Sequence, residues 1–113
     1  MSEYVFLYRN APDSARPSPK EMQERMQTWM AWMQELGDKG HIKDRGQPLD
    51  SGGKVVRDFG KSITDGPYPE AKDVVLGYTL IEAKDLAQAA ELARNCPIFH
   101  GGGAVEVRPV MSM

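Results

Sequence analysis

The sequence contains little cysteine, no long apolar run and no excess of basic residues. Its single cysteine, Cys96, cannot form an internal disulfide and has no neighbouring cysteine or histidine at a zinc-ligand spacing. We therefore expect no disulfide, no structural metal and a reducing, cytoplasmic environment. The apolar run from Tyr4 to Tyr8 is far shorter than the ~20 residues of a membrane helix, so we expect neither export nor a membrane anchor.

The charges are balanced. The chain has 14 Lys+Arg against 16 Asp+Glu, a formal net charge of -2, and the two signs alternate along it. Proteins that bind nucleic acid usually carry a basic stripe, so nucleic acid is not an expected partner. A length of 113 residues fits one domain, and we expect residues 1–113 to fold as a single unit.

Local patterns predict an order of strands and helices. A strand is expected over residues 3–9, and a helix begins at about Pro19, where Ser18 and Glu21 have the spacing of a capping box. Asp85 repeats this pattern before a second helix, which begins at Leu86 and ends at Cys96-Pro97. Further strands are predicted over residues 41–43, 54–59, 61–64, 74–81 and 104–110, with turns at residues 50–53 and 59–61.

The first helix carries apolar side chains at spacings of three and four residues. This pattern predicts one stripe that faces the core and leaves Trp32 about 40° beyond its edge. The residues of the stripe are Met22, Met26, Trp29, Met30, Met33 and Leu36.

The order of elements predicts an α+β protein: a ferredoxin-like sandwich with an antiparallel sheet and two helices on one face. The other face of the sheet must then be either polar or covered by something else. Depending on the register, its outward positions carry Tyr4, Phe6, Tyr8, Val75 or Tyr78. An exposed apolar face of that size usually marks an interface. We therefore expect a homodimer in which the two sheets pack face to face.

The densest polar segment runs from Lys61 to Asp73 and reads K-S-I-T-D-G-P-Y-P-E-A-K-D. Asp65 begins a rigid D-G-P turn that can hold its carboxylate still. The charged residues that follow could bind a polar small molecule, or they could be solvated while Asp65 only caps the turn.

Several segments together resemble the DGPF proteins, a branch of the YCII-related family. They are T-D-G-P-Y-P-E-A-K-D, V-L-G-Y-T-L-I-E-A-K-D-L-A-Q-A-A-E-L-A, N-C-P, G-G-A-V-E-V-R-P-V, and the W-M-A-W-M-Q-E-L helix with its following glycine and histidine. The resemblance covers nearly the whole chain. Tyr68 stands where the family has Phe, and Asp73 where Glu is common.

The resemblance implies a dimeric α/β barrel and, in the wider group, a histidine–aspartate active site. The group's histidine lies near the start of the first helix, and residues 18–36 contain none. Two histidines remain, and the pair that we predict for acid–base chemistry is Asp65 with His100. The predicted binding residues are His41, Tyr68, Glu70 and Lys72. No metal-ligand set and no cofactor motif can be named.

Three functions fit these features. The chain could be a small-molecule enzyme or binding protein with its pocket near the DGPY turn or at the dimer interface. It could instead be a non-catalytic accessory or sensor protein, because the resemblance also implies a link to extracytoplasmic-function sigma factors. The third alternative is a structural dimer whose turn only locks the fold. A cavity with convergent titratable groups would favour the first.

Overall fold

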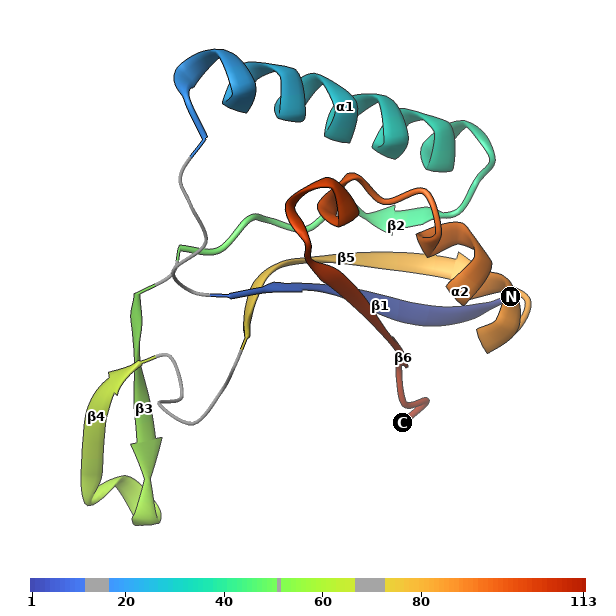
Figure 1. Cartoon of the computed structure of the whole chain (residues 1–113). Coiled ribbons are helices and arrows are strands. Elements are labelled where there is room, and N and C mark those ends of the chain that lie inside the picture. The colour runs from blue at the N-terminus through green and yellow to red at the C-terminus, as the bar shows by residue number, and fades with distance from the viewer. Residues whose placement is uncertain (12–16, 51, 67–72) are drawn as a thin grey trace.

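A computed structural model describes residues 1–11, 17–50, 52–66 and 73–113. Two α-helices, six strands and two short 3-10 turns alternate along this part of the chain (Figure 1). In chain order they are β1 (Ser2–Asn10), α1 (Pro19–Asp38), β2 (Ile42–Asp44), β3 (Gly53–Arg57), η1 (Asp58–Gly60), β4 (Ser62–Gly66), β5 (Val74–Ala83), α2 (Leu86–Ala93), η2 (Pro97–Gly101) and β6 (Ala104–Pro109).

Four of the strands form an antiparallel sheet in the order β2-β5-β1-β6, and both α-helices lie on one face of it (Figure 1). This is the strand order of a β-α-β-β-α-β ferredoxin-like unit, with β3 and β4 inserted between its second and third strands. The predicted α+β class and the two helices on one face are confirmed. Neither helix is long and apolar enough to cross a membrane within the described ranges.

Both helix starts follow the capping pattern read from the sequence. The Ser18 hydroxyl accepts a hydrogen bond from the Glu21 amide at 3.2 Å, and Asp85 Oδ1 accepts one from the Gln88 amide at 2.8 Å. Each contact satisfies an amide that has no partner within its own helix. The positions at which α1 and α2 begin are therefore fixed locally.

The turn predicted at residues 50–53 does not join two paired strands. β2 pairs with β5 in the main sheet, whereas β3 pairs only with β4 in a separate two-stranded sheet. The reversal between β3 and β4 is made at η1, near the second predicted bend. Ser51 itself lies outside the described residues.

The core lies between the sheet and the helices. Tyr4, Phe6 and Tyr8 alternate along β1 toward the helices, and α1 presents Trp32 and Leu36 to them. The Trp32 ring stacks on that of Phe6 with 6.1 Å between the ring centroids. This packing gives the domain one aromatic-rich core.

The predicted core stripe of α1 is wrong in part. Met22, Met26 and Met30 are exposed, whereas Trp32 is only 5% exposed. At 100° per residue, the helix turns by about 200° between Met30 and Trp32, so the two side chains point to nearly opposite sides of the helix. The Trp29–Trp32–Leu36 side packs on the sheet because it brings the two large rings into the core.

Neither of the described α-helices lies over the opposite face of the sheet (Figure 1). Val5, Leu7, Tyr78 and Leu80 alternate with the buried residues of β1 and β5 and are half-buried. We call this surface the open face. The β3–η1–β4 hairpin, residues 53–66, projects from the body toward the open-face side (Figure 1). We call this hairpin the arm.

Candidate functional site

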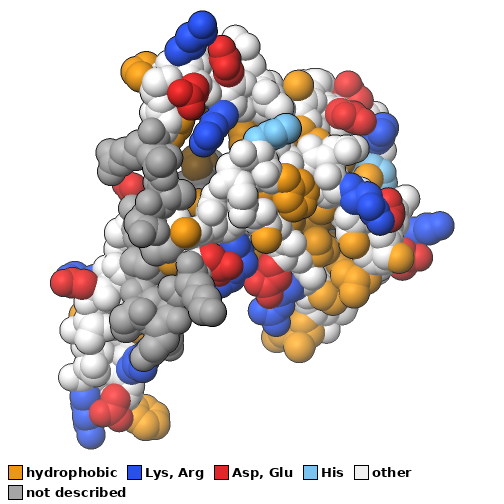
Figure 2. Space-filling view, viewed as in Figure 1, with side chains coloured by type: hydrophobic (Ala, Val, Ile, Leu, Met, Phe, Trp, Pro, Cys, Tyr) orange, Lys and Arg blue, Asp and Glu red, His pale blue; other side chains and the backbone are white. Residues whose placement is uncertain are grey.

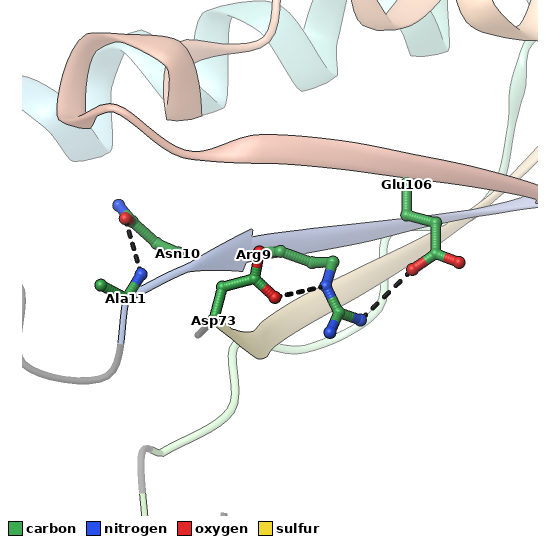
Figure 3. A network of polar contacts seen from close by, with 5 residues as sticks. All are labelled: Arg9, Asn10, Ala11, Asp73 and Glu106. Carbon is green, nitrogen blue, oxygen red and sulfur yellow. Dashed lines mark hydrogen bonds and ion pairs between the residues drawn. The ribbon is translucent and has the colours of Figure 1, made fainter. Parts of the chain in front are cut away.

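Three charged side chains meet at the end of the open face where the chain enters β5. Arg9 Nε donates a hydrogen bond to Asp73 Oδ1 at 2.9 Å, and Arg9 Nη1 donates one to Glu106 Oε1 at 3.2 Å. Figure 3 shows the guanidinium between the two carboxylates, on the side of the sheet away from the helices. We call these three residues the Arg9 cluster.

Strand pairing brings the Arg9 cluster together. Arg9 follows the register shift between Tyr8 and Arg9 in β1, and it lies opposite Val75 in β5 and Ala104 in β6. Glu106 lies two residues along β6 from Ala104, so it projects to the same face. Asp73 immediately precedes β5. Each of the three therefore comes from a different strand or strand entry.

The next residue of β1 joins the same end of the sheet to η2. Asn10 Oδ1 accepts a hydrogen bond from the amide of Ala11 at 2.8 Å (Figure 3). Asn10 Nδ2 donates one to the carbonyl of Gly101 at 3.2 Å. These contacts fix the backbone where β1 ends. The backbone position from which the Arg9 side chain extends is therefore well defined.

The Arg9 cluster is polar and accessible. The side chains of Arg9, Asp73 and Glu106 are 30%, 46% and 42% exposed, and together they carry one net negative charge. Ion pairs at such exposure contribute only about 0–1 kcal/mol each to stability. The two pairs use two of the five N–H donors of the guanidinium. The remaining donors and carboxylate lone pairs can bind another polar molecule.

The structure places Asp65 on the arm rather than in the Arg9 cluster. Its Oδ1 accepts a hydrogen bond from Lys54 Nζ at 2.7 Å, a cross-strand contact between β4 and β3. The Asp65 side chain is 89% exposed. Tyr68, Glu70 and Lys72 lie outside the described residues, so their positions stay predictions.

The two histidines lie on other elements. His41 Nδ1 donates a hydrogen bond to the carbonyl of Glu82 at 2.8 Å and ties the end of α1 to β5. His100 is exposed on η2 and has no hydrogen bond or ion pair with a described residue. Figure 1 shows η2 beside the helices and the arm on the other side of the sheet. The single chain does not bring His100 and Asp65 together, and their pairing stays a prediction.

Two further titratable groups belong to the core. Thr79 Oγ1 donates to the carbonyl of Arg45 at 3.0 Å, so the Tyr8 hydroxyl, 2.7 Å away, is the donor to Thr79. Burial raises the pKa of Tyr8 well above its usual range. Burial also raises the pKa of the Cys96 thiol to about 12, which makes this thiol inert.

Metal ligands are not gathered in the described ranges. No group of three or more His, Cys, Asp or Glu side chains there is arranged to hold a metal ion. The carboxylates of Asp73 and Glu106 are instead engaged with Arg9.

Sequence reasoning missed Arg9 and Glu106. Alternation along the first and last strands places both residues on the face away from the helices. This alternation is the sequence signal that could have identified them. The ferredoxin-like order implies that β1 and β6 are neighbours, but the sequence does not show the register that brings together these two residues, which are 97 positions apart.

The fold and the Arg9 cluster define a small ferredoxin-like α+β domain with a charged site on its open face. The sequence model of the YCII-related domain matches residues 2–113, and the chain belongs to this family. A search of curated proteins finds no significant match.

A solved structure with a similar fold is 5-chloro-2-hydroxyhydroquinone dehydrochlorinase (TftG) from Burkholderia phenoliruptrix AC1100, in complex with 2,5-dihydroxybenzoquinone. The match covers 98% of this chain and 95% of that chain, with 18% sequence identity and a TM-score of 0.46.

Proposed function

We propose that the protein binds a small organic ligand at the Arg9 cluster, beside the D-G-P-Y-P-E-A-K-D segment, and works as a cytoplasmic homodimer of the DGPF type. The observation that carries the proposal is the geometry of the cluster. Arg9 offers donors and two carboxylates offer acceptors within one half-exposed site. Such a site suits a ligand that presents both kinds of group.

The surface beside the Arg9 cluster defines the rest of the ligand. Leu7 lies opposite Glu106 on one side and Tyr78 on the other, and both Leu7 and Tyr78 are half-buried on the open face. An apolar body could cover these two side chains while its polar edge meets Arg9. We infer a ligand with an apolar body and a hydrogen-bonding edge, which is the usual division of groups in small-molecule sites.

The D-G-P-Y-P segment supplies the proposed neighbours of this ligand. Asp73 belongs to the Arg9 cluster, and Tyr68, Glu70 and Lys72 precede it by one to five residues. This sequence proximity supports binding roles for these three residues. In the enzymatic form of the proposal, Asp65 and His100 exchange a proton with the ligand, and His41 remains a proposed binding residue.

Homodimer formation is supported by the open face. Four apolar side chains, Val5, Leu7, Tyr78 and Leu80, form a band across β1 and β5 on the face away from the described helices (Figure 1). A two-fold contact between two such faces would bury Val5 and Leu80 in both copies and leave Leu7 and Tyr78, nearer to Arg9, to the ligand. The ligand would then lie at the edge of the dimer interface.

A thermal-shift screen with a library of small aromatic and polar metabolites tests ligand binding. A ligand that binds only the folded state stabilises it by about 2.7 kcal/mol at a hundred times its Kd. We expect a hit to raise the Tm of the wild type but not that of Arg9→Met. Arg94→Met is the matched control, because it removes an exposed arginine–carboxylate pair on the helix side. An equal shift in both variants, or no hit in the library, would count against the proposal.

A second candidate function is a non-catalytic accessory or sensor protein linked to an extracytoplasmic-function sigma factor. The placement of the histidines favours it, because neither His41 nor His100 contacts a carboxylate among the described residues. A ligand-binding site without an acid–base pair suits sensing better than catalysis. If a bound hit is recovered chemically unchanged after long incubation, sensing is supported; its conversion would support the enzymatic form.

A further inference from the structure

The arm has few contacts with the rest of the domain. It is a two-stranded sheet of its own, and it stands away from the main sheet on the open-face side (Figure 1). Figure 2 shows it as a separate projection with an apolar group at its tip and charged side chains of both signs in the corner beside the body. An isolated two-stranded hairpin is only marginally stable in water. The arm therefore needs packing that the described part of its own chain does not supply.

The arm presents apolar side chains to solvent. Val56 and Ile63 are opposite each other on β3 and β4 and are 60% and 63% exposed. At the tip, Phe59 is fully exposed and has a φ of 56°, in the left-handed region that bulky residues avoid. A fully exposed aromatic side chain near an exposed apolar pair is typical of a contact surface.

The surface area of the chain supports the same conclusion. The accessible surface is 8151 Å², whereas a compact monomer of 12.6 kDa has about 6,200 Å². The radius of gyration is 15.6 Å, against about 13 Å for a compact domain of this length. The excess surface of about 2,000 Å² is within the roughly 1,000–2,500 Å² that each copy buries in a large permanent dimer.

We propose that the arm clasps a second copy of this chain, with Val56, Phe59 and Ile63 as its apolar anchor. This inference rests on the homodimer proposed above and names a contact that holds it together. A second copy is the favoured occupant because the arm projects on the same side as the uncovered apolar band of the open face (Figure 1). A copy packed on that face lies between the arm and the sheet of the first chain. Because the contact is two-fold symmetric, the arm of the second copy contacts the first chain in the same way.

The clasp also carries a predicted site residue into the interface. Lys54 and Asp65 form one cross-strand pair, and Val56 and Ile63 form another two positions along. Side chains two positions apart on a strand share a face, so Asp65 lies on the anchor face of the arm. When the arm docks, Asp65 becomes part of the dimer interface. In the enzymatic form of the proposed function, which uses Asp65, the ligand site then needs both copies to be complete.

The main test changes the anchor to polar residues that keep strand propensity. The variant combines Val56→Thr, Phe59→Ser and Ile63→Thr, since threonine remains a good strand former. The matched control, Met26→Ser with Met30→Ser, removes exposed apolar side chains from the helix side. Sedimentation velocity from nanomolar to micromolar concentration should show that the anchor variant raises the dimer Kd by about a hundredfold or more. The control should dimerise like the wild type.

A second measurement does not depend on how well the variant folds. A photoreactive phenylalanine analogue at position 59 should give covalent dimers on irradiation. When two preparations of different mass are mixed and allowed to exchange, crosslinks of mixed mass are expected. Crosslinks confined to one chain would overturn the inference.

The outcomes separate the clasp from the dimer itself. A wild type that stays monomeric at micromolar concentration overturns both the proposed homodimer and the clasp. A dimeric wild type whose anchor variant dimerises equally tightly overturns only the clasp. Weakened dimerisation of the anchor variant alone, with crosslinks of mixed mass, supports it.

Discussion

Trp32 is the residue on which the packing of α1 against the sheet depends most. It is 5% exposed, and its ring contacts those of Phe6, Tyr8 and Trp29 at centroid distances of 6.1, 6.2 and 5.7 Å. The perturbation that we consider is Trp32→Leu. Leucine keeps an apolar side chain of good helix propensity but removes the indole ring from all three contacts.

The magnitude follows from the buried volume and the lost ring contacts. Truncation of a buried tryptophan to alanine costs about 3–5 kcal/mol, and leucine restores part of that volume. Each aromatic pair contributes a further ~0.5–1.5 kcal/mol beyond its buried area. We expect Trp32→Leu to lower the free energy of unfolding by about 2–4 kcal/mol. A domain of this kind has roughly 5–15 kcal/mol in total, so the variant should still fold.

Met30→Leu is the control, because it introduces the same side chain on the same helix at a position that is 62% exposed. Surface substitutions of this kind change stability by less than about 0.5 kcal/mol. Urea unfolding followed by circular dichroism at one protein concentration gives both values by linear extrapolation. The reasoning would be refuted by a loss below about 1 kcal/mol for Trp32→Leu, or by a larger loss for Met30→Leu.

Two further predictions follow from local geometry. Gly46→Ala should lower the free energy of unfolding by about 2–4 kcal/mol, because φ is 72° and a Cβ would lie 1.8 Å from the Tyr78 carbonyl oxygen. Gly40→Ala, with φ of 80° and open space, should cost only about 1–2 kcal/mol in the same urea assay, and equal losses would contradict this. Because burial raises the pKa of Cys96 from 9.0 to about 12, alkylation by iodoacetamide at pH 8 should be about a thousandfold slower in the folded protein than in urea. The same pKa means that the stability contributed by the protonated thiol is fully present below pH 9 and is lost as pH rises toward 12. A native alkylation rate within about tenfold of the unfolded rate would contradict the burial of this thiol.

The sequence predicted those parts of the fold that depend on neighbouring residues. The starts of both helices were predictable because Ser18 and Asp85 cap amides only three residues away. The long strand β5 was predictable from its own β-branched and aromatic residues. These features need no knowledge of the rest of the chain.

The face of α1 was not predictable from spacing alone. Met22, Met26 and Met30 have helical periodicity as good as that of Trp29, Trp32 and Leu36. The choice between the two sides is made by the sheet, whose Phe6 offers a ring for Trp32 to stack on. Periodicity identifies an amphipathic helix, but the partner surface decides which of two adjacent apolar lines is buried.

The candidate site was predictable only where it is continuous in sequence. The K-S-I-T-D-G-P-Y-P-E-A-K-D run drew attention to Asp65 and Asp73, but the partners of Asp73 are Arg9 and, through it, Glu106. These contacts arise from strands at opposite ends of the chain that pair in the sheet. A pattern within one segment contains no information about such pairing.

The position of the arm separates the residues needed for folding from those that we propose for function. The ferredoxin-like unit is complete with β1, α1, β2, β5, α2 and β6, and the arm is inserted between β2 and β5. Because the arm adds little to the core, exposed apolar residues on it have no evident folding role that would explain them. Asp65 lies on this insertion, and the D-G-P-Y-P segment leads from it to Asp73 in the Arg9 cluster. The insertion and Asp73 of the Arg9 cluster are thus parts of one continuous segment, which is why we expect changes in the arm to affect dimerisation and ligand binding before they affect the core.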